Sequence, residues 1–153
     1  MGLFNKKTMI YSPANGLVKS IEKVNDEMFA AKALGDGFAV EPIAESIVSP
    51  IEGTVISVFP TKHAISLRTK QGLEVLLHIG IDTVELNGEG FSIKVEEGTK
   101  VIAETVLAEV DFSLLAAKGK ETDVMVIFTN LDKKQFVFKE GQAAAGQEIG
   151  TVS

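Results

Sequence analysis

The 153-residue sequence contains no cysteine and no tryptophan, and it has only two histidines. Without cysteine the chain can form no disulfide, no thiolate nucleophile and no thiolate metal site. Chemistry that needs a nitrogen nucleophile or an imidazole ligand must therefore use His63 or His78.

The chain also has no excess of positive charge. It contains 15 Lys and Arg residues and 21 Asp and Glu residues, which gives a net charge of -6. This balance argues against nucleic acid and against an anionic membrane surface, and it permits a basic protein partner. No secretory signal is recognisable, and no apolar run approaches the roughly eighteen residues of a membrane helix. The segment Met1–Thr8 has too few apolar residues for stable membrane attachment. We expect a monomeric, cytoplasmic protein with no stable membrane insertion.

Long helical patterns are scarce as well. Short runs of Val, Ile, Thr and Phe are punctuated by Gly, which is typical of β-strands. One short helix is expected over Ser113–Gly119, with Ser113 as its cap and Gly119 as its end. No Pro-rich or Ser-rich linker divides the chain, so we expect one all-β domain over residues 11–153, preceded by a short extension over residues 1–10.

Two pairs of segments resemble each other at offsets of about forty residues. Residues 12–18 (SPANGLV) resemble residues 49–55 (SPIEGTV), and residues 97–107 resemble residues 140–149. Each unit is typical of a strand that turns at Gly and returns. The repetition predicts an antiparallel β-sandwich of duplicated hairpin units with pseudo-twofold character, with at most one or two short helices. Chance recurrence of Pro-x-x-Gly turns is the alternative.

The two histidines lie on neighbouring strand-like runs, residues 61–69 and 73–80, which are joined by residues 70–72. A two-residue or four-residue turn places the imidazoles on the same face of a hairpin, with Cβ atoms about 5 Å apart when they are directly opposite. Only a three-residue loop places them on opposite faces. The sequence favours two imidazoles side by side.

Alternation along the second run separates a core face from a mixed face. The expected core positions are Leu73, Val75, Leu77 and Ile79, and the mixed face carries Glu74, Leu76, His78 and Gly80. Histidine has an ordinary pKa near 6.5, so a neutral imidazole with a free lone pair is available near pH 7. One ring nitrogen can then attack a phosphoryl group if a hydrogen bond fixes the N–H at the other nitrogen. A second imidazole can donate to the phosphoryl oxygens. The same pair could bind zinc if Asp82 or an outside carboxylate completed the site, and spacing alone does not decide between these chemistries.

The residues around the histidines resemble a known family. Residues 72–84 (GLEVLLHIGIDTV), 59–67 (FPTKHAISL) and 34–40 (LGDGFAV) are similar to the glucose-type IIA component of the bacterial sugar phosphotransferase system. The similarity runs from Tyr11 to Ile149 and includes T-x-H before the first histidine and H-[aliphatic]-G-[aliphatic]-D-T at the second. It implies an antiparallel β-sandwich and a phosphotransferase component. Such a phosphocarrier accepts a phosphoryl group from phospho-HPr and passes it to a IIB domain of a sugar permease.

The resemblance also implies roles for particular residues. His78 would be phosphorylated on Nε2, while the carbonyl of Gly80 holds its Nδ1. His63 would be the supporting imidazole, oriented by a side-chain hydrogen bond from Thr61. In the family an apolar patch docks donor and acceptor proteins, and two carboxylates meet a basic residue of the donor. The matching patch positions here are Met28, Phe29, Ala33, Leu34, Phe59 and Leu76, and the matching carboxylates are Asp26 and Asp82.

A zinc-dependent hydrolase is the alternative function, because zinc endopeptidases of cell walls use a related duplicated β fold. That class needs an H-x-H pair at the second strand and a further histidine motif. Here Leu76 stands two residues before His78, and no third histidine exists. We therefore expect a phosphocarrier that requires no cofactor, with His63 and His78 as weak zinc ligands that a partner completes. The sequence permits regulatory proteins as further partners and does not determine them.

Overall fold

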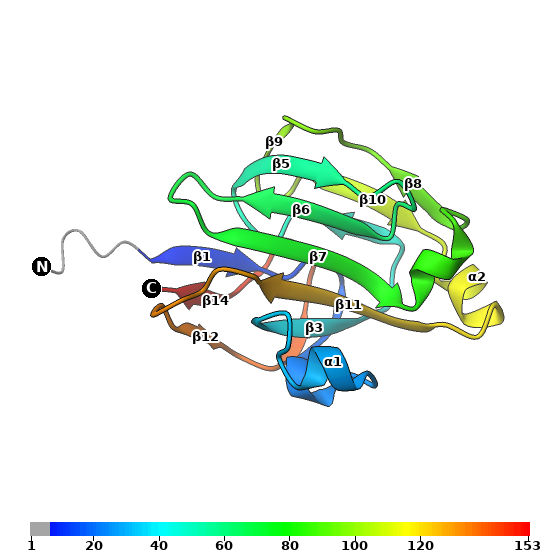
Figure 1. Ribbon diagram of the computed structural model, residues 1–153, viewed down its shortest axis with the longest axis horizontal. Coiled ribbons are helices and arrows are strands. Elements are labelled where there is room, and N and C mark those ends of the chain that lie inside the picture. Colours follow the sequence, from blue (N-terminus) through cyan, green and yellow to red (C-terminus); the bar gives the residue numbers. More distant parts are fainter. Residues whose placement is uncertain (1–6) are drawn as a thin grey trace, which may run out of the picture.

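The structure, a computed structural model, describes residues 7–153 and consists mainly of antiparallel strands arranged in layers (Figure 1). The strands are β1 (Thr8–Tyr11), β2 (Gly16–Ser20), β3 (Asp36–Pro42), β4 (Ser46–Val48), β5 (Gly53–Val58), β6 (Ala64–Arg68), β7 (Glu74–Ile81), β8 (Phe91–Ile93), β9 (Lys100–Val101), β10 (Val106–Val110), β11 (Glu121–Phe128), β12 (Phe136–Phe138), β13 (Gly141–Ala143) and β14 (Glu148–Val152). Helical structure in the described part consists of the α-helices α1 (Glu27–Ala30) and α2 (Phe112–Ala117) and the 3₁₀-helices η2 (Ile21–Lys23) and η3 (Thr83–Leu86). The expected all-β sandwich with at most two short α-helices is confirmed.

The strand order has an internal symmetry. One eight-stranded sheet runs β13-β2-β3-β11-β7-β6-β5-β9, and two three-stranded sheets run β1-β14-β12 and β4-β10-β8. The pair β11 and β7 lies at the middle of the large sheet, and the strands on either side of it correspond in order. The centre of this pseudo-twofold arrangement is therefore the pair of strands that includes the run carrying His78.

The repeated Ser-Pro segments adopt the same turn at equivalent places. Ser12 and Ser49 are fully buried, and each hydroxyl donates to the carbonyl oxygen two residues later. The oxygen–oxygen distances are 2.7 Å to Ala14 and 2.5 Å to Ile51. Because the same buried hydrogen bond recurs before β2 and before β5, the expected duplication of hairpin units is confirmed.

The main core lies between the large sheet and the two small ones. In β7 the inward side chains Val75, Leu77 and Ile79 are buried, as alternation predicts. Four phenylalanines join β3 and β11 of the large sheet to β12 of a small one, with ring centroids 4.7 to 6.0 Å apart. These residues, the phenylalanine cluster, are Phe38, Phe128, Phe136 and Phe138.

Two expectations about element boundaries were wrong. Helix α2 begins at Phe112 instead of Ser113, because the Asp111 carboxylate caps it by accepting from the Leu114 amide at 3.0 Å. At the N-terminus, β1 pairs with β14 from Thr8 onward, so the expected boundary before residue 11 falls inside a strand. The remainder of the expected extension, residues 1–6, lies outside the described residues.

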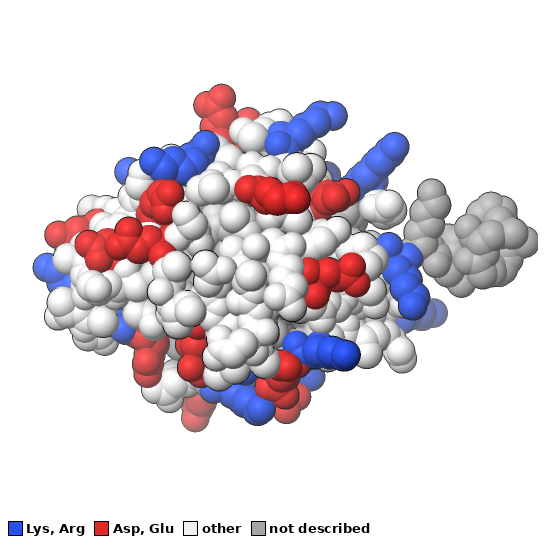
Figure 2. Space-filling view, turned by 180° about the vertical axis from the view of Figure 1, so that it is seen from behind, with Lys and Arg blue, Asp and Glu red and all other residues white. Residues whose placement is uncertain are grey.

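The surface mixes charges of both signs. On the face opposite the view of Figure 1, uncharged side chains lie between scattered acidic and basic residues, without a continuous basic region (Figure 2). The mixture on this face agrees with the net charge of -6. Within residues 7–153, no helix combines the length and hydrophobicity that crossing a membrane requires.

The phenylalanine cluster predicts that loss of the buried Phe38 ring destabilises the packing between the sheets. Phe38→Ala should reduce the free energy of unfolding by about 3–5 kcal/mol, because Phe38 is fully buried and its removal leaves a cavity. Val137→Ala is the control, since Val137 lies between two members of the cluster but is 62% exposed, and its effect should stay within about 0.5 kcal/mol. Urea unfolding measures both variants, and equal losses would contradict a role for the cluster.

Candidate active site

His78 lies on the outer face of the large sheet, near its middle. It is paired with Ala64 of β6 on one side and with Met125 of β11 on the other. A second, smaller apolar cluster covers this face beneath α1 and η2, and its Phe29 ring lies 5.0 Å from the His78 ring, centroid to centroid. Because small or apolar side chains surround the imidazole, much of it is removed from water although it remains half-buried rather than closed off.

One ring nitrogen of His78 is fixed by the backbone. Its Nδ1 lies 2.8 Å from the carbonyl oxygen of Gly80, two residues further along the chain. A carbonyl oxygen only accepts hydrogen bonds, so the neutral ring carries its proton on Nδ1. The lone pair is then on Nε2. This contact agrees with the geometry that the family resemblance implied for His78 and Gly80.

The hairpin between β6 and β7 differs from the expected register. Ala64 pairs with His78 and Arg68 pairs with Glu74, so residues 70–72 form a three-residue loop closed by Thr69 and Leu73. The expectation of a two-residue or four-residue turn was therefore wrong. In a continuous strand this register would put His63 and His78 on opposite faces.

His63 nevertheless lies beside His78, because it is not part of the strand. Strand β6 begins at Ala64, and residues 60–63 form the turn after β5, with Lys62 in the left-handed region at φ 64°. The His63 carbonyl still accepts from the Ile79 amide at 2.8 Å, which ties the turn to β7. The two imidazole centroids are 4.9 Å apart with ring planes at 78°.

Two neighbours fix the His63 ring. The Thr61 hydroxyl oxygen lies 2.7 Å from Nδ1 of His63, as the resemblance implied. The Phe59 ring meets the imidazole edge to face, with centroids 5.6 Å apart. His63 is only 5% exposed, so its ring is held between these side chains and His78.

Burial changes the ionisation of both imidazoles. Burial, followed by the neighbouring His63, lowers the pKa of His78 to about 4, against the opposing effects of the Gly80 hydrogen bond and the charges of Asp26 and Asp82. Burial also lowers the pKa of His63, partly offset by a hydrogen bond with the Thr61 backbone. Both rings are therefore neutral near pH 7, and His78 has an available lone pair.

Two of the expected docking residues, Phe29 and Phe59, contact the imidazoles, and the six positions differ in exposure. Met28 is 54% exposed, Leu34 41% and Phe59 38%, and Ala33 is exposed as well. Leu76 is half-buried, and it lines with Phe59 a groove of about 280 Å³ beside the site. Phe29 is only 8% exposed. Its ring packs under α1 and against His78, so little of it is available to a partner.

The two expected carboxylates also have different surroundings. The Asp26 side chain accepts from the amides of Met28 and Phe29, so it caps α1 and is half-buried. Asp82 is exposed at the turn after β7, in the left-handed region at φ 61°, and makes no capping bond with its side chain. Both charges act on His78, and Asp82 is the more accessible to a partner.

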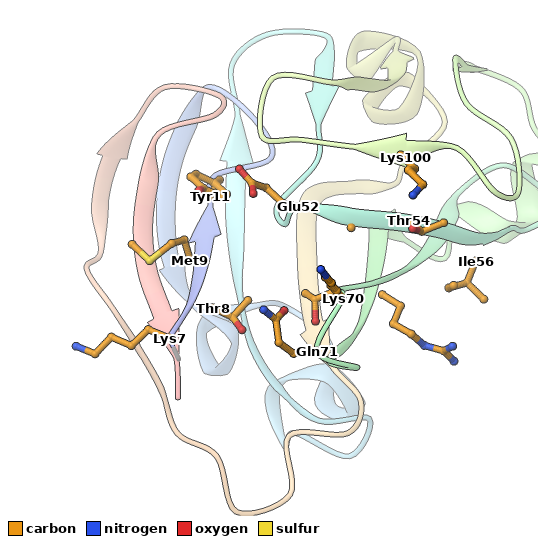
Figure 3. A pocket seen from close by; sticks show the side chains of 13 residues that line it. Lys7, Thr8, Met9, Tyr11, Glu52, Thr54, Ile56, Lys70, Gln71 and Lys100 are labelled. Atoms are coloured by element: carbon orange, nitrogen blue, oxygen red, sulfur yellow. The ribbon is translucent and has the colours of Figure 1, made fainter. Parts of the chain in front are cut away.

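The arrangement gives two metal ligands rather than a complete site. Within residues 7–153, no group of three or more His, Cys, Asp and Glu residues is placed to hold a metal ion. A hollow of about 760 Å³ lies elsewhere, lined among others by Tyr11, Glu52, Lys70 and Lys100, and contains neither histidine (Figure 3). The candidate chemistry therefore belongs to a shallow surface site around the two imidazoles.

Two features of the site were not found from the sequence. Helix α1, which carries Phe29 against His78, has only four residues and gives no helical periodicity, although Asp26 is a typical cap residue. Thr83 is fully buried directly behind Gly80, and its only signal was its place at the end of the H-I-G-I-D-T run.

Comparisons with known proteins agree with this geometry. Residues 8–134 match the family model of the phosphoenolpyruvate-dependent sugar phosphotransferase system, EIIA 1. A glucose-specific EIIA component from Halalkalibacterium halodurans is 42% identical over 148 residues, covering 97% of this chain and 84% of the relative. A glucose-specific EIICBA component from Streptococcus pneumoniae is 49% identical over 145 residues, and the match covers 94% of this chain but only 20% of that longer protein.

A solved structure is also similar. Glucose permease IIA from Mycoplasma capricolum superposes with a TM-score of 0.92 at 38% identity, covering 97% of each chain. The resemblance stated from the motifs around the two histidines is thus confirmed. By the match over residues 8–134 and by the relatives that it covers almost completely, the chain belongs to the EIIA 1 family of the phosphoenolpyruvate-dependent sugar phosphotransferase system.

Proposed function

We propose that the chain is the phosphocarrier that accepts a phosphoryl group from phospho-HPr on Nε2 of His78 and passes it to a IIB domain of a glucose-type permease. The observation that supports this most strongly is the 2.8 Å contact between Nδ1 of His78 and the Gly80 carbonyl, next to a second imidazole. It leaves Nε2 with a lone pair and without a proton to lose.

The transfer needs no co-reactant. The Nε2 lone pair of His78 forms a bond to phosphorus while the donor's phosphorus–nitrogen bond breaks, and that electron pair stays on the donor nitrogen. In the tautomer in which Thr61 donates to Nδ1 of His63, Nε2–H of His63 can donate to a phosphoryl oxygen and stabilise its charge. The onward step to the IIB domain is the same exchange with His78 as the donor.

Docking of both partners is assigned to the exposed apolar residues around the histidines. Met28, Leu34 and Phe59 provide surface that a partner removes from water, and Leu76 lines the groove beside them. Asp82 forms an acidic rim that suits a basic residue of the donor. Phe29 supports this surface from beneath.

We propose only weak binding of zinc. His63 and His78 supply two nitrogen ligands, which is half of a tetrahedral site, and a partner carboxylate and water would have to supply the rest. The phosphoryl transfer does not depend on it. The zinc-hydrolase alternative finds no support, because the described residues form no group of three metal ligands.

The division of roles between the histidines predicts different defects. His78→Ala should fold and accept no phosphoryl group from phospho-HPr, because the nucleophilic nitrogen is gone. His63→Gln keeps a hydrogen-bond donor, so it should still accept the group but fail in onward transfer to a IIB domain. Intact mass and a coupled transfer assay measure the two steps. Phosphate gained on a histidine of His78→Ala would contradict the assignment.

The docking surface predicts a ranking of two variants. Phe59→Lys places a charge in a surface that must lose its water, whereas Asp82→Asn removes a rim contact that salt already screens. Phe59→Lys should therefore weaken HPr binding far more than Asp82→Asn in calorimetric titrations. Equal losses for the two variants would contradict an apolar docking surface.

The low pKa of His78 predicts how acceptor activity depends on pH. Because the folded pKa lies below the ordinary value of 6.5, His78 stays unprotonated as pH falls to about 5, and it becomes protonated only near pH 4. Phe29→Ala should raise this pKa toward 6.5, because it removes the ring that buries the imidazole. Met28→Ala, on the exposed side of α1, is the control and should leave it unchanged. NMR titration measures the pKa, and a wild-type value near 6.5 would refute the burial argument.

A further inference from the structure

Thr83 is a fully buried threonine that the proposed transfer does not use. It lies at the start of η3, in the turn that follows β7. Its hydroxyl donates to the carbonyl oxygen of Ile79 at 2.6 Å. That carbonyl belongs to the peptide unit that joins Ile79 to Gly80, so the hydroxyl holds the backbone directly before the residue that contacts His78.

Gly80 lies at an irregular place in β7, so its backbone conformation is not that of a regular strand. Its φ of 78° lies in the region that glycine enters freely and that other residues avoid. The pairing of β7 with β11 is also interrupted here, since the register shifts between Glu121 and Val124 opposite Ile81 and Ile79. A bulge sets two residues of one strand opposite one residue of its partner and disrupts the ladder locally, and here residues 122 and 123 lie opposite Gly80.

The methyl group of Thr83 packs against Gly80 itself. A Cβ placed on Gly80 would lie 2.5 Å from Cγ2 of Thr83 and 3.0 Å from the carbonyl oxygen of Glu121. The methyl therefore fills the space beside the Gly80 Cα. Both branches of the threonine side chain hold the Gly80 backbone, one by a hydrogen bond and one by packing.

We infer that Thr83 is a positioning residue that fixes the Ile79–Gly80 backbone so that the Gly80 carbonyl accepts the proton on Nδ1 of His78. Thr83 thereby selects the tautomer whose lone pair is on Nε2. The hydroxyl carries the effect, because it bonds the carbonyl oxygen of the peptide that joins Ile79 to Gly80. The consequence for phosphoryl uptake rests on the proposed function, whereas the consequence for the tautomer does not.

Thr83→Val and Thr83→Ser separate the hydroxyl from the shape of the side chain. Valine keeps the volume and removes the donor, so the buried Ile79 carbonyl loses its partner. Serine keeps the donor and removes the methyl. Thr69→Val is the matched control, because Thr69 is also buried and its hydroxyl bonds the Leu73 amide at 3.0 Å, at the far end of the hairpin.

The primary measurement is the ¹⁵N spectrum of the imidazoles at pH 7, where His78 is neutral and its two nitrogens report the tautomer. In the wild type and in Thr69→Val, the proton of His78 should be on Nδ1. In Thr83→Val a population with the proton on Nε2 should appear, and phosphoryl uptake from phospho-HPr should fall roughly 5- to 10-fold, the scale of one lost hydrogen bond. Thr83→Ser should keep the wild-type tautomer and stay within about twofold of its rate.

An unchanged His78 tautomer in a folded Thr83→Val variant would overturn the inference. An equal shift of the tautomer in Thr83→Ser and Thr83→Val would also overturn it, because packing rather than the hydroxyl would then be responsible. If Thr83→Val did not fold, Thr83→Ala with Thr69→Ala as its control would be read by the same criteria. A wild-type protein that takes up no phosphoryl group, with the tautomer shift still present, would reject the proposed function and leave the positioning role intact.

Discussion

The hydrogen bond from Nδ1 of His78 to the carbonyl of Gly80 is the interaction on which the site depends. It requires a residue at position 80 that can adopt a φ of 78°, which glycine does without strain. It also requires an interruption in the pairing with β11, because a regular ladder would direct this carbonyl toward the neighbouring strand. Gly80 and the bulge opposite it together leave a backbone carbonyl at the end of β7 free to bond Nδ1 of His78 and so orient its ring.

The second requirement of the site is a compromise between burial and access. The Phe29 ring of α1 and the turn that carries His63 enclose His78 from two sides, and this burial keeps the imidazole neutral. The outer face of the sheet remains open enough for a partner to reach it. The proposed docking surface consists of exposed apolar residues, whereas Phe29 is buried and affects the ionisation of His78 from within.

Much of the fold, and the proximity of the two histidines, could be predicted from the sequence. The alternation along β7 and the repeated Ser-Pro turns are local patterns, and the structure keeps them. The register predicted for the β6–β7 hairpin was wrong, because the composition of residues 70–72 does not distinguish a three-residue loop from shorter and longer ones. His63 still faces His78 because alternation stops at Ala64, where the strand begins.

Two supporting features of the His78 site were harder to predict, helix α1 and the burial of Thr83. Helix α1 is one turn long, and its four residues acquire their conformation from the Asp26 cap and from packing on the sheet rather than from helical periodicity. Thr83 is buried against Gly80, near the carbonyl of Glu121 in β11, a strand that comes much later in the sequence. Neither feature shows in the alternation or helical periodicity of the sequence.

The most direct test of the central claim is the position of the phosphoryl group in the phosphorylated protein. Phosphorylation with phosphoenolpyruvate, enzyme I and HPr, followed by ¹⁵N and ³¹P NMR, identifies both the residue and the ring nitrogen. The geometry predicts one phosphohistidine, at His78, with phosphorus bonded to Nε2 while Nδ1 keeps its proton and its bond to Gly80. Phosphorus on Nδ1 of His78, or on His63, would contradict the assignment.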